Sequence, residues 1–178
     1  YYLRRYLAFC QAEFAKVPGG KAEVAEELAE HFAEIKGALE DSRHLLEGPL
    51  SDAERKRVLD ALGRSGDAYR QRLYAAGFSG ATRSLGVAEL QAFCSLAQKH
   101  LDHSIRANRR RDGLFHAYNL MKVVGDGIEV RHLPEMLEGQ VAVLSSGALE
   151  TAEALELLTA LRGSALYRAD QASYVLYP

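Results

Sequence analysis

The chain has 178 residues, of which 48% are hydrophobic and 26% are charged, a composition typical of a folded globular protein rather than a disordered one. Its formal net charge of −2 provides no overall basic field, which argues against a nucleic-acid partner. No apolar run reaches the roughly 20 residues of a membrane-spanning helix, so no membrane partner is expected. We expect a single domain over residues 1–178.

Helical periodicity dominates the first part of the chain. The spacing of apolar residues predicts a helix over residues 2–17, which the Pro18-Gly19-Gly20 segment ends. A second helix is predicted over residues 21–46, with apolar residues three and four positions apart.

The next two predicted helices carry clearer local signals. Ser51 and Glu54 have the spacing of a capping box, which predicts the start of a third helix. Gly63 and Gly66 interrupt that helix, so we expect either a bend or the close approach of another backbone. A fourth helix is predicted over residues 87–106.

The last third of the chain departs from continuous helix. Gly125-Asp126-Gly127 lies between two β-branched runs, which predicts a hairpin of strands over residues 120–124 and 128–132. Pro134 suits the first position of a fifth helix that ends near Gly147. A sixth helix is predicted over residues 151–162, with Leu155, Leu158 and Leu161 facing inward.

These elements predict a mainly α fold with one small β-hairpin near residues 120–132. Long helices with short breaks are typical of an antiparallel helical bundle or of part of an α/α toroid. The chain begins at Tyr1 within a helical pattern and ends at Pro178 after a strand-like run, so we expect a fragment of a larger protein. Cys10 and Cys94 lie far apart in apolar helical patterns, which favours reduced thiols and a cytoplasmic location.

The densest positive cluster is Arg109-Arg110-Arg111, with Arg106 one helical turn earlier. Guanidinium groups bind phosphates or carboxylates through two parallel hydrogen bonds. The same run also suits a solvated helix end, where cations offset the helix dipole. Nucleic-acid binding is disfavoured because the chain has no second basic stripe.

The segment from Asp112 to Asn119 combines a turn at Gly113 with His116 and Tyr118. Aromatic faces that stack, beside polar groups that set orientation, suit a sugar or another polyol. A structural role is the alternative, with Asp112 capping the turn and the rings packed. The predicted ligand-binding residues are Arg110, Arg111, Asp112, His116, Tyr118 and Asn119.

Catalytic and metal-binding patterns are sparse. His100 and His103 share a helical face, with Asp102 between them, but a zinc site needs at least three protein ligands, so no metal site is predicted. Phosphate-cradling and dinucleotide-binding motifs are missing, and no cofactor is predicted. A glycosidase needs two facing carboxyl groups, and the sequence leaves the catalytic residues unknown. The carboxylates nearest the unusual segment are Asp112, Glu129, Glu135 and Glu138.

Residues 108–178 contain the stretches DGLFHAYNLM, LPEMLEGQVAVLSSGALETAEALELLTALR and LYRADQASYVLYP. These stretches resemble an internal segment of large, poorly characterised bacterial proteins related to helical-toroid carbohydrate-active enzymes such as the glycoside phosphorylases. The resemblance covers about two-fifths of the chain and includes no diagnostic catalytic motif. It implies an α/α fold and a carbohydrate-related role, although a shared fold does not by itself establish a function.

The leading hypothesis is a helical module of a larger bacterial protein that supports carbohydrate binding or processing. The alternative is a non-catalytic scaffold or protein-interaction domain. We expect no enzymatic activity from this chain alone. The expected partners are the rest of the full-length protein, a saccharide ligand and, through exposed apolar surface, a second copy of the chain. A cleft at Tyr118 and His116 favours the first hypothesis, and burial in a satisfied network favours the second.

Overall fold

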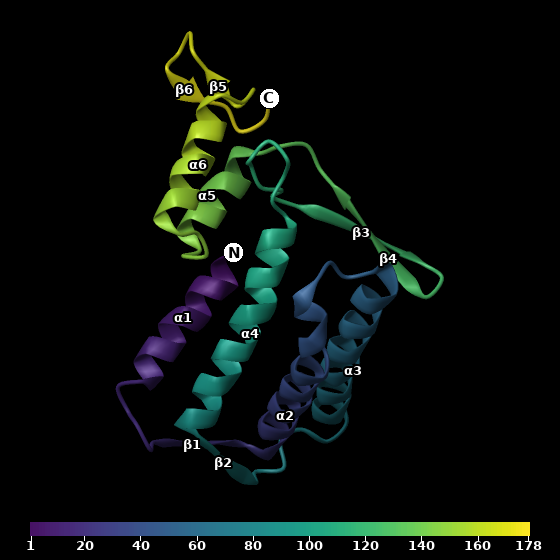
Figure 1. Ribbon diagram of the computed structural model, residues 1–178. Helices are drawn as coiled ribbons and strands as arrows, with labels where there is room; N and C mark the ends of the chain where they lie inside the picture. The colour runs from purple at the N-terminus through teal and green to yellow at the C-terminus, as the bar shows by residue number, and fades with distance from the viewer. The chain divides into compact units, whose positions relative to one another are not determined.

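The structure is a computed structural model that describes residues 1–178, of which 57% are helical (Figure 1). Six α-helices and three small two-stranded antiparallel sheets confirm the predicted mainly α class. The expectation of one domain stays a prediction. The chain forms two compact units: unit 1 comprises residues 1–6, 101–124 and 129–178, and unit 2 comprises residues 7–100 and 125–128.

Two helices contribute residues to both units. α1 covers Tyr2–Phe14 and ends three residues earlier than predicted, because the chain turns before Pro18 through a hydrogen bond from the Lys16 amide to the Glu13 carbonyl. α4 covers Val87–Ala107, within one residue of the prediction. No helix combines the length and the apolar character needed to cross a membrane.

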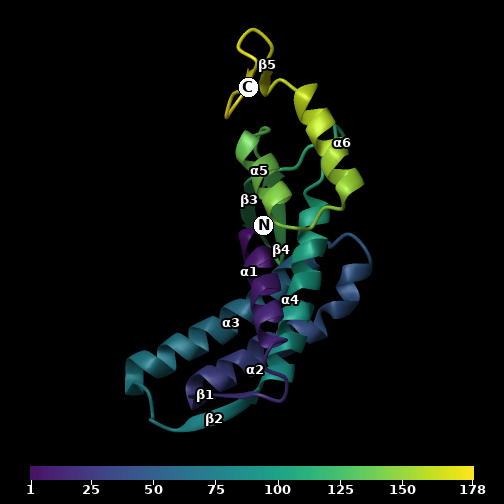
Figure 2. The same ribbon diagram turned by 90° about the vertical axis from the view of Figure 1, so that its left-hand side faces the viewer.

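Unit 2 is built around a helical hairpin. α2 (Glu26–Asp41) leads through a 3-10 turn, η1 (Arg43–Glu47), into α3 (Asp52–Ala76), and α2 and α3 lie side by side in both ribbon views (Figures 1 and 2). The His31 ring stacks on Tyr69 with centroids 4.7 Å apart, which fixes the pairing of the two helices.

The predicted second helix is wrong at its start. β1 (Lys21–Ala25) pairs antiparallel with β2 (Thr82–Gly86), from Lys21 opposite Gly86 to Ala25 opposite Thr82. The helical pattern of the segment yields to this pairing because cross-strand partners satisfy its backbone groups, and tertiary context overrides weak local propensity.

The sequence of α3 contains two local signals, a capping box at its start and two glycines in its interior. The capping box is confirmed: the Ser51 hydroxyl accepts from the Glu54 amide at 3.3 Å, and the Glu54 carboxylate accepts from the Ser51 amide at 2.7 Å. Of the two alternatives at Gly63 and Gly66, the close approach of another backbone is wrong. A Cβ at Gly63 would meet nothing within 4 Å, a Cβ at Gly66 would meet only the Arg70 side chain at 3.5 Å, and α3 is continuous through both.

Unit 1 contains most of the predicted hairpin. β3 (Asn119–Val124) pairs with β4 (Gly127–His132) through a turn at Gly125, whose φ of +55° is the left-handed conformation that glycine adopts without strain. This confirms the hairpin near residues 120–132. A second short hairpin, β5 (Tyr167–Arg168) with β6 (Ser173–Tyr174), was not predicted.

The two C-terminal helices differ from the prediction in detail. α5 covers Leu137–Ser145, because Met136 is extended and the Leu137 amide donates to the Leu176 carbonyl. α6 covers Thr151–Arg162, as predicted. Its inward face is Leu157 and Leu161, whereas the side chains of Leu155 and Leu158 are 65% and 49% exposed, so the inward orientation predicted for those two is wrong.

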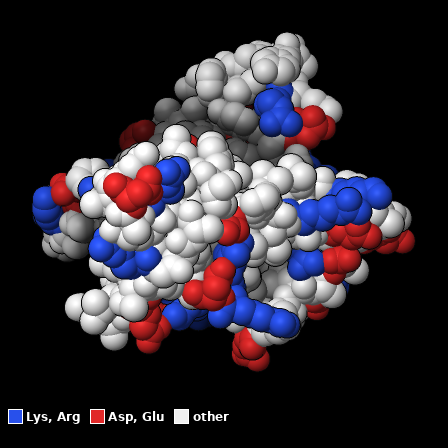
Figure 3. Space-filling view, turned by 90° about the horizontal axis from the view of Figure 1, so that it is seen from above, with Lys and Arg blue, Asp and Glu red and all other residues white.

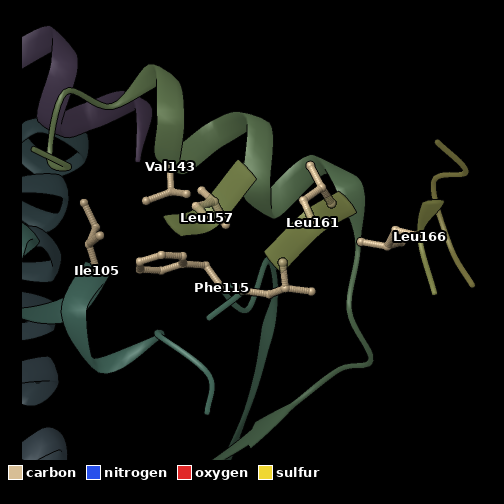
Figure 4. Packing of buried hydrophobic residues seen from close by; sticks show 7 residues of the cluster. Ile105, Phe115, Val143, Leu157, Leu161 and Leu166 are labelled. Carbon is tan, nitrogen blue, oxygen red and sulfur yellow. The ribbon is translucent and has the colours of Figure 1, made fainter. Parts of the chain in front are cut away.

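The core of unit 1 joins α4, α5 and α6 to the segment that follows α4. Figure 4 shows the cluster, in which Phe115 lies between α4 and the two C-terminal helices. Side chains buried in this way supply most of the apolar surface removed from water on folding. The labelled members of the cluster are Ile105, Phe115, Val143, Leu157, Leu161 and Leu166.

Candidate functional site

A tight turn at Gly113 organises the residues after α4. The Arg110 amide donates to the Leu114 carbonyl at 2.8 Å, and the Asp112 carboxylate accepts from the Leu114 amide at 3.2 Å. Gly113 has a φ of +85°, and a Cβ there would come within 3.2 Å of the Ala160 Cβ. Both the backbone conformation and the close approach therefore favour glycine at this position.

The arginine cluster is largely occupied by intramolecular ion pairs. Arg110 binds Asp112 through two parallel contacts, at 3.1 and 2.8 Å, and lies 3.3 Å from Glu135. The hydrogen bonds that Arg110 donates to Asp112 raise the pKa of Arg110 and lower the pKa of Asp112. Arg110 therefore offers no unpaired guanidinium to a ligand.

The neighbouring arginines divide into paired and exposed side chains. Arg109 contacts Glu156 at 2.6 Å, and Arg106 contacts Glu153 at 3.4 Å. Arg111 is exposed and forms no ion pair within residues 1–178. Figure 3 shows basic and acidic side chains beside one another on the face that it presents. This face therefore carries both signs of charge.

His116 is held by backbone contacts and ring stacking. Its ring lies parallel to the His132 ring, with centroids 3.8 Å apart, and its amide donates to the Asn108 carbonyl at 2.9 Å. Its side chain also hydrogen-bonds the Leu133 backbone, whereas its buried Nδ1 has no partner. Burial, followed by the proximity of His132 and Arg110, lowers the pKa of His116.

Asn119 belongs to a chain of side-chain hydrogen bonds. Its Oδ1 contacts His132 Nδ1 at 2.8 Å, and its Nδ2 donates to Asn108 Oδ1 at 2.8 Å. Asn108 in turn donates to the Ser104 carbonyl at 2.9 Å. The amide of Asn119 is thus used to tie β3 to β4 and to the end of α4.

Tyr118 lines a pocket. The pocket has a volume of about 300 Å³, at the lower end of the range for small-molecule sites. The Tyr118 side chain is 56% exposed, and the nearby charge of Glu138, whose carboxylate also accepts a hydrogen bond from Tyr118, raises its pKa. The lining residues are Tyr1, Tyr2, Ala117, Tyr118, Glu138, Gly139 and Ala142.

The base of this pocket is shaped by close packing between segments. Gly139 lies against Ala117, so that a Cβ on Gly139 would come within 2.9 Å of the Ala117 Cβ and within 3.1 Å of its backbone. The Tyr1 hydroxyl donates to the His116 carbonyl at 2.8 Å, and burial raises the pKa of Tyr1 to about 12. The hydroxyls of Tyr1 and Tyr118 therefore stay protonated at neutral pH.

The structure thus separates the predicted set of ligand-binding residues. Arg110 and Asp112 bind each other, His116 and Asn119 both contact His132, and only Tyr118 lines the pocket. Sequence reasoning did not assign Tyr1, Tyr2 or Gly139 to a site, and named Glu138 only as a nearby carboxylate. A glycine inside a predicted helix was the available signal for the close packing at Gly139.

The remaining candidates have ordinary partners. The His100 ring contacts the Leu39 carbonyl at 2.9 Å, and Asp102 binds Arg4 at 2.6 Å. No group of three or more histidine, cysteine, aspartate or glutamate residues is arranged to hold a metal ion. No family model matches the chain, and no curated protein matches it at a significant level.

Proposed function

We propose that unit 1 is a saccharide-binding module of a larger, cytoplasmic carbohydrate-processing protein, and that its helices are part of an α/α toroid or helical bundle. The observation that carries the proposal is the pocket whose lining includes Tyr1, Tyr2, Tyr118 and Glu138. Tyrosine faces stack on the apolar faces of sugar rings, and a carboxylate accepts hydrogen bonds from sugar hydroxyls. The resemblance of residues 108–178 to the relatives of glycoside phosphorylases supports the same class of ligand.

The role proposed for this pocket does not include catalysis. Of the carboxylates near the segment, Asp112 and Glu135 share Arg110, and Glu129 lies 3.7 Å from Arg131. Glu138 alone borders the pocket. A hydrolytic site requires two carboxyl groups facing one bond, so the role proposed for this pocket is binding and orientation.

The test is binding of a panel of oligosaccharides, measured by calorimetry and by NMR of the tyrosine rings. We expect Tyr118→Ala to weaken binding at least tenfold while leaving the melting temperature unchanged, because the side chain is largely exposed. Tyr74→Ala, which removes an exposed tyrosine of α3, is the matched control and should bind like the wild type. Equal binding by wild type and Tyr118→Ala, or no saccharide binding at all, would overturn the proposal.

A second function, a protein-interaction scaffold, is favoured by β3. Every residue of this strand is exposed, including the apolar side chains of Leu120, Met121 and Val123. Exposed apolar strands are sites of association with other chains. We expect Met121→Lys combined with Val123→Lys to abolish any concentration-dependent increase in mass by light scattering. A wild-type mass that stays constant with concentration would argue against self-association.

A further inference from the structure

The pocket at Tyr118 differs from the rest of unit 1 in its charge. Its lining includes three tyrosines and Glu138, and none of the seven lining residues has a cationic side chain. Glu138 forms no ion pair within residues 1–178, although Asp112 and Glu135 are both paired with Arg110. An ionised carboxylate without a counter-ion, beside aromatic rings, leaves a negative potential in the cavity.

The position of Glu138 at the start of a helix and its effect on Tyr118 both concern this negative charge. Glu138 lies in the first turn of α5, where the helix dipole stabilises a negative charge. Its charge is also the largest cause of the raised pKa of Tyr118, because ionising that hydroxyl would place a second negative charge beside the first. The local field therefore opposes anions and attracts cations.

Aromatic rings add an attraction of the same sign. The face of a tyrosine ring carries the negative part of its quadrupole, and ammonium groups bind over such faces. Tyr118, Tyr1 and Tyr2 all contribute to the lining of this pocket. A neutral hydroxyl would gain only a hydrogen bond to Glu138. A protonated amine would gain a charge-assisted contact with Glu138 and also the attraction to the tyrosine rings.

We propose that this pocket binds the protonated amino group of an amino sugar, with Glu138 as the counter-ion and the tyrosine rings around the cation. The proposal rests on the saccharide-binding function proposed above and names its ligand class. The distinguishing property of the ligand is a free amine, because an acetylated amine is neutral and could not pair with the carboxylate.

The test compares three oligosaccharides that share one β-linked backbone and differ at a single ring position: a glucosamine oligomer, an N-acetylglucosamine oligomer and a glucose oligomer. Affinities are measured by calorimetry at about pH 6, where the free amine is protonated. The protein used in these measurements carries a short neutral peptide before Tyr1, so that no α-amino group places a positive charge near the pocket.

We expect the glucosamine oligomer to bind about tenfold more tightly than the other two, which is the ratio for one favourable charged contact. Glu138→Gln should remove this preference and leave a weak, equal affinity for all three. Glu129→Gln, which removes a carboxylate of β4 away from the pocket lining, should keep it. Tyr118→Phe should keep it as well, because the ring remains.

The outcomes separate the two proposals. Equal binding of the three oligomers by the wild type, lost in Tyr118→Ala, would overturn the amino-sugar inference and leave the saccharide-binding function intact. A preference that persists in Glu138→Gln would also overturn the inference, because the counter-ion would then be another group. Binding of none of the three would overturn both.

Discussion

The side chain of Gln140 pairs with the backbone of Phe115 as a neighbouring strand would. Gln140 Oε1 accepts from the Phe115 amide at 2.8 Å, and Gln140 Nε2 donates to the Phe115 carbonyl at 2.8 Å. The same Nε2 donates to the Met136 carbonyl at 2.9 Å. Gln140 is fully buried, so one side chain satisfies backbone groups that have no access to water.

Gln140→Met should lower the free energy of unfolding by about 2–4 kcal/mol, because it keeps the side-chain volume but leaves a buried donor and acceptor of Phe115 without partners. Urea denaturation followed by circular dichroism measures the change. Gln171→Met alters an exposed glutamine of unit 1 and should change stability by less than about 0.5 kcal/mol. Similar losses from both variants would show that the buried pairing contributes little.

Gly139→Ala should lower the free energy of unfolding by about 1–3 kcal/mol, because the new methyl group would overlap Ala117 and force α5 away from it. Gly63→Ala is the matched control in α3. It should raise stability by up to about 1 kcal/mol, since the methyl group meets no neighbour and alanine favours helix. The denaturant midpoints of the two variants measure these changes. An unchanged stability of Gly139→Ala would contradict the packing described at the base of the pocket.

The stability of unit 1 should fall as the pH drops below about 6.5. The pKa of His116 is lowered from 6.5 in the folded chain, so the unfolded state binds more protons in the window between the lowered value and 6.5. The stabilisation from the neutral ring is present above 6.5 and is lost as the pH falls through the folded pKa. His116→Phe keeps a ring beside His132 but cannot titrate, and should flatten this part of the profile. An unchanged pH slope in the variant would assign the effect to another group.

Removing the charge of Glu138 should lower the pKa of Tyr118 towards the ordinary value of 10.0, because that charge is the first cause of the shift. NMR of carbon-labelled tyrosine rings during an alkaline titration follows Tyr118 separately from the other tyrosines. Glu156→Gln removes a carboxylate that binds Arg109 and lies outside the pocket lining, so it should leave the Tyr118 titration unchanged. A Tyr118 titration that is the same in Glu138→Gln and wild type would contradict the proximity on which the ligand inference rests.

Local signals in the sequence were sufficient for some elements and not for others. The β3–β4 hairpin follows from a turn whose residues are adjacent in sequence, with Gly125 at its centre. The β1–β2 pairing joins segments that the whole α2–α3 hairpin separates. Such non-local pairing is decided by tertiary context, which a periodicity pattern does not contain.

The same distinction applies to the candidate site. Tyr118 was chosen from the composition of its own segment, and it does line the pocket. Its partners come from the first residues of α1 and the first turn of α5, which only folding brings together. The ion pair between Arg110 and Glu135 and the stacking of His116 on His132 likewise join separate segments, and they explain why most of the predicted ligand-binding residues are engaged within the chain.

The antiparallel pairing of β1 and β2 brings the two ends of the α2–α3 hairpin together. The amide of Glu26 donates to the carbonyl of Ala81 at 3.0 Å, so the chain leaves the strand pair and returns to it at one point. A segment with adjacent ends can change length at little cost in chain entropy, because loop closure depends only weakly on loop length. Related proteins can therefore shorten, lengthen or replace residues 26–81 as a cassette, and a protein engineer can graft a different helical hairpin at the same junction.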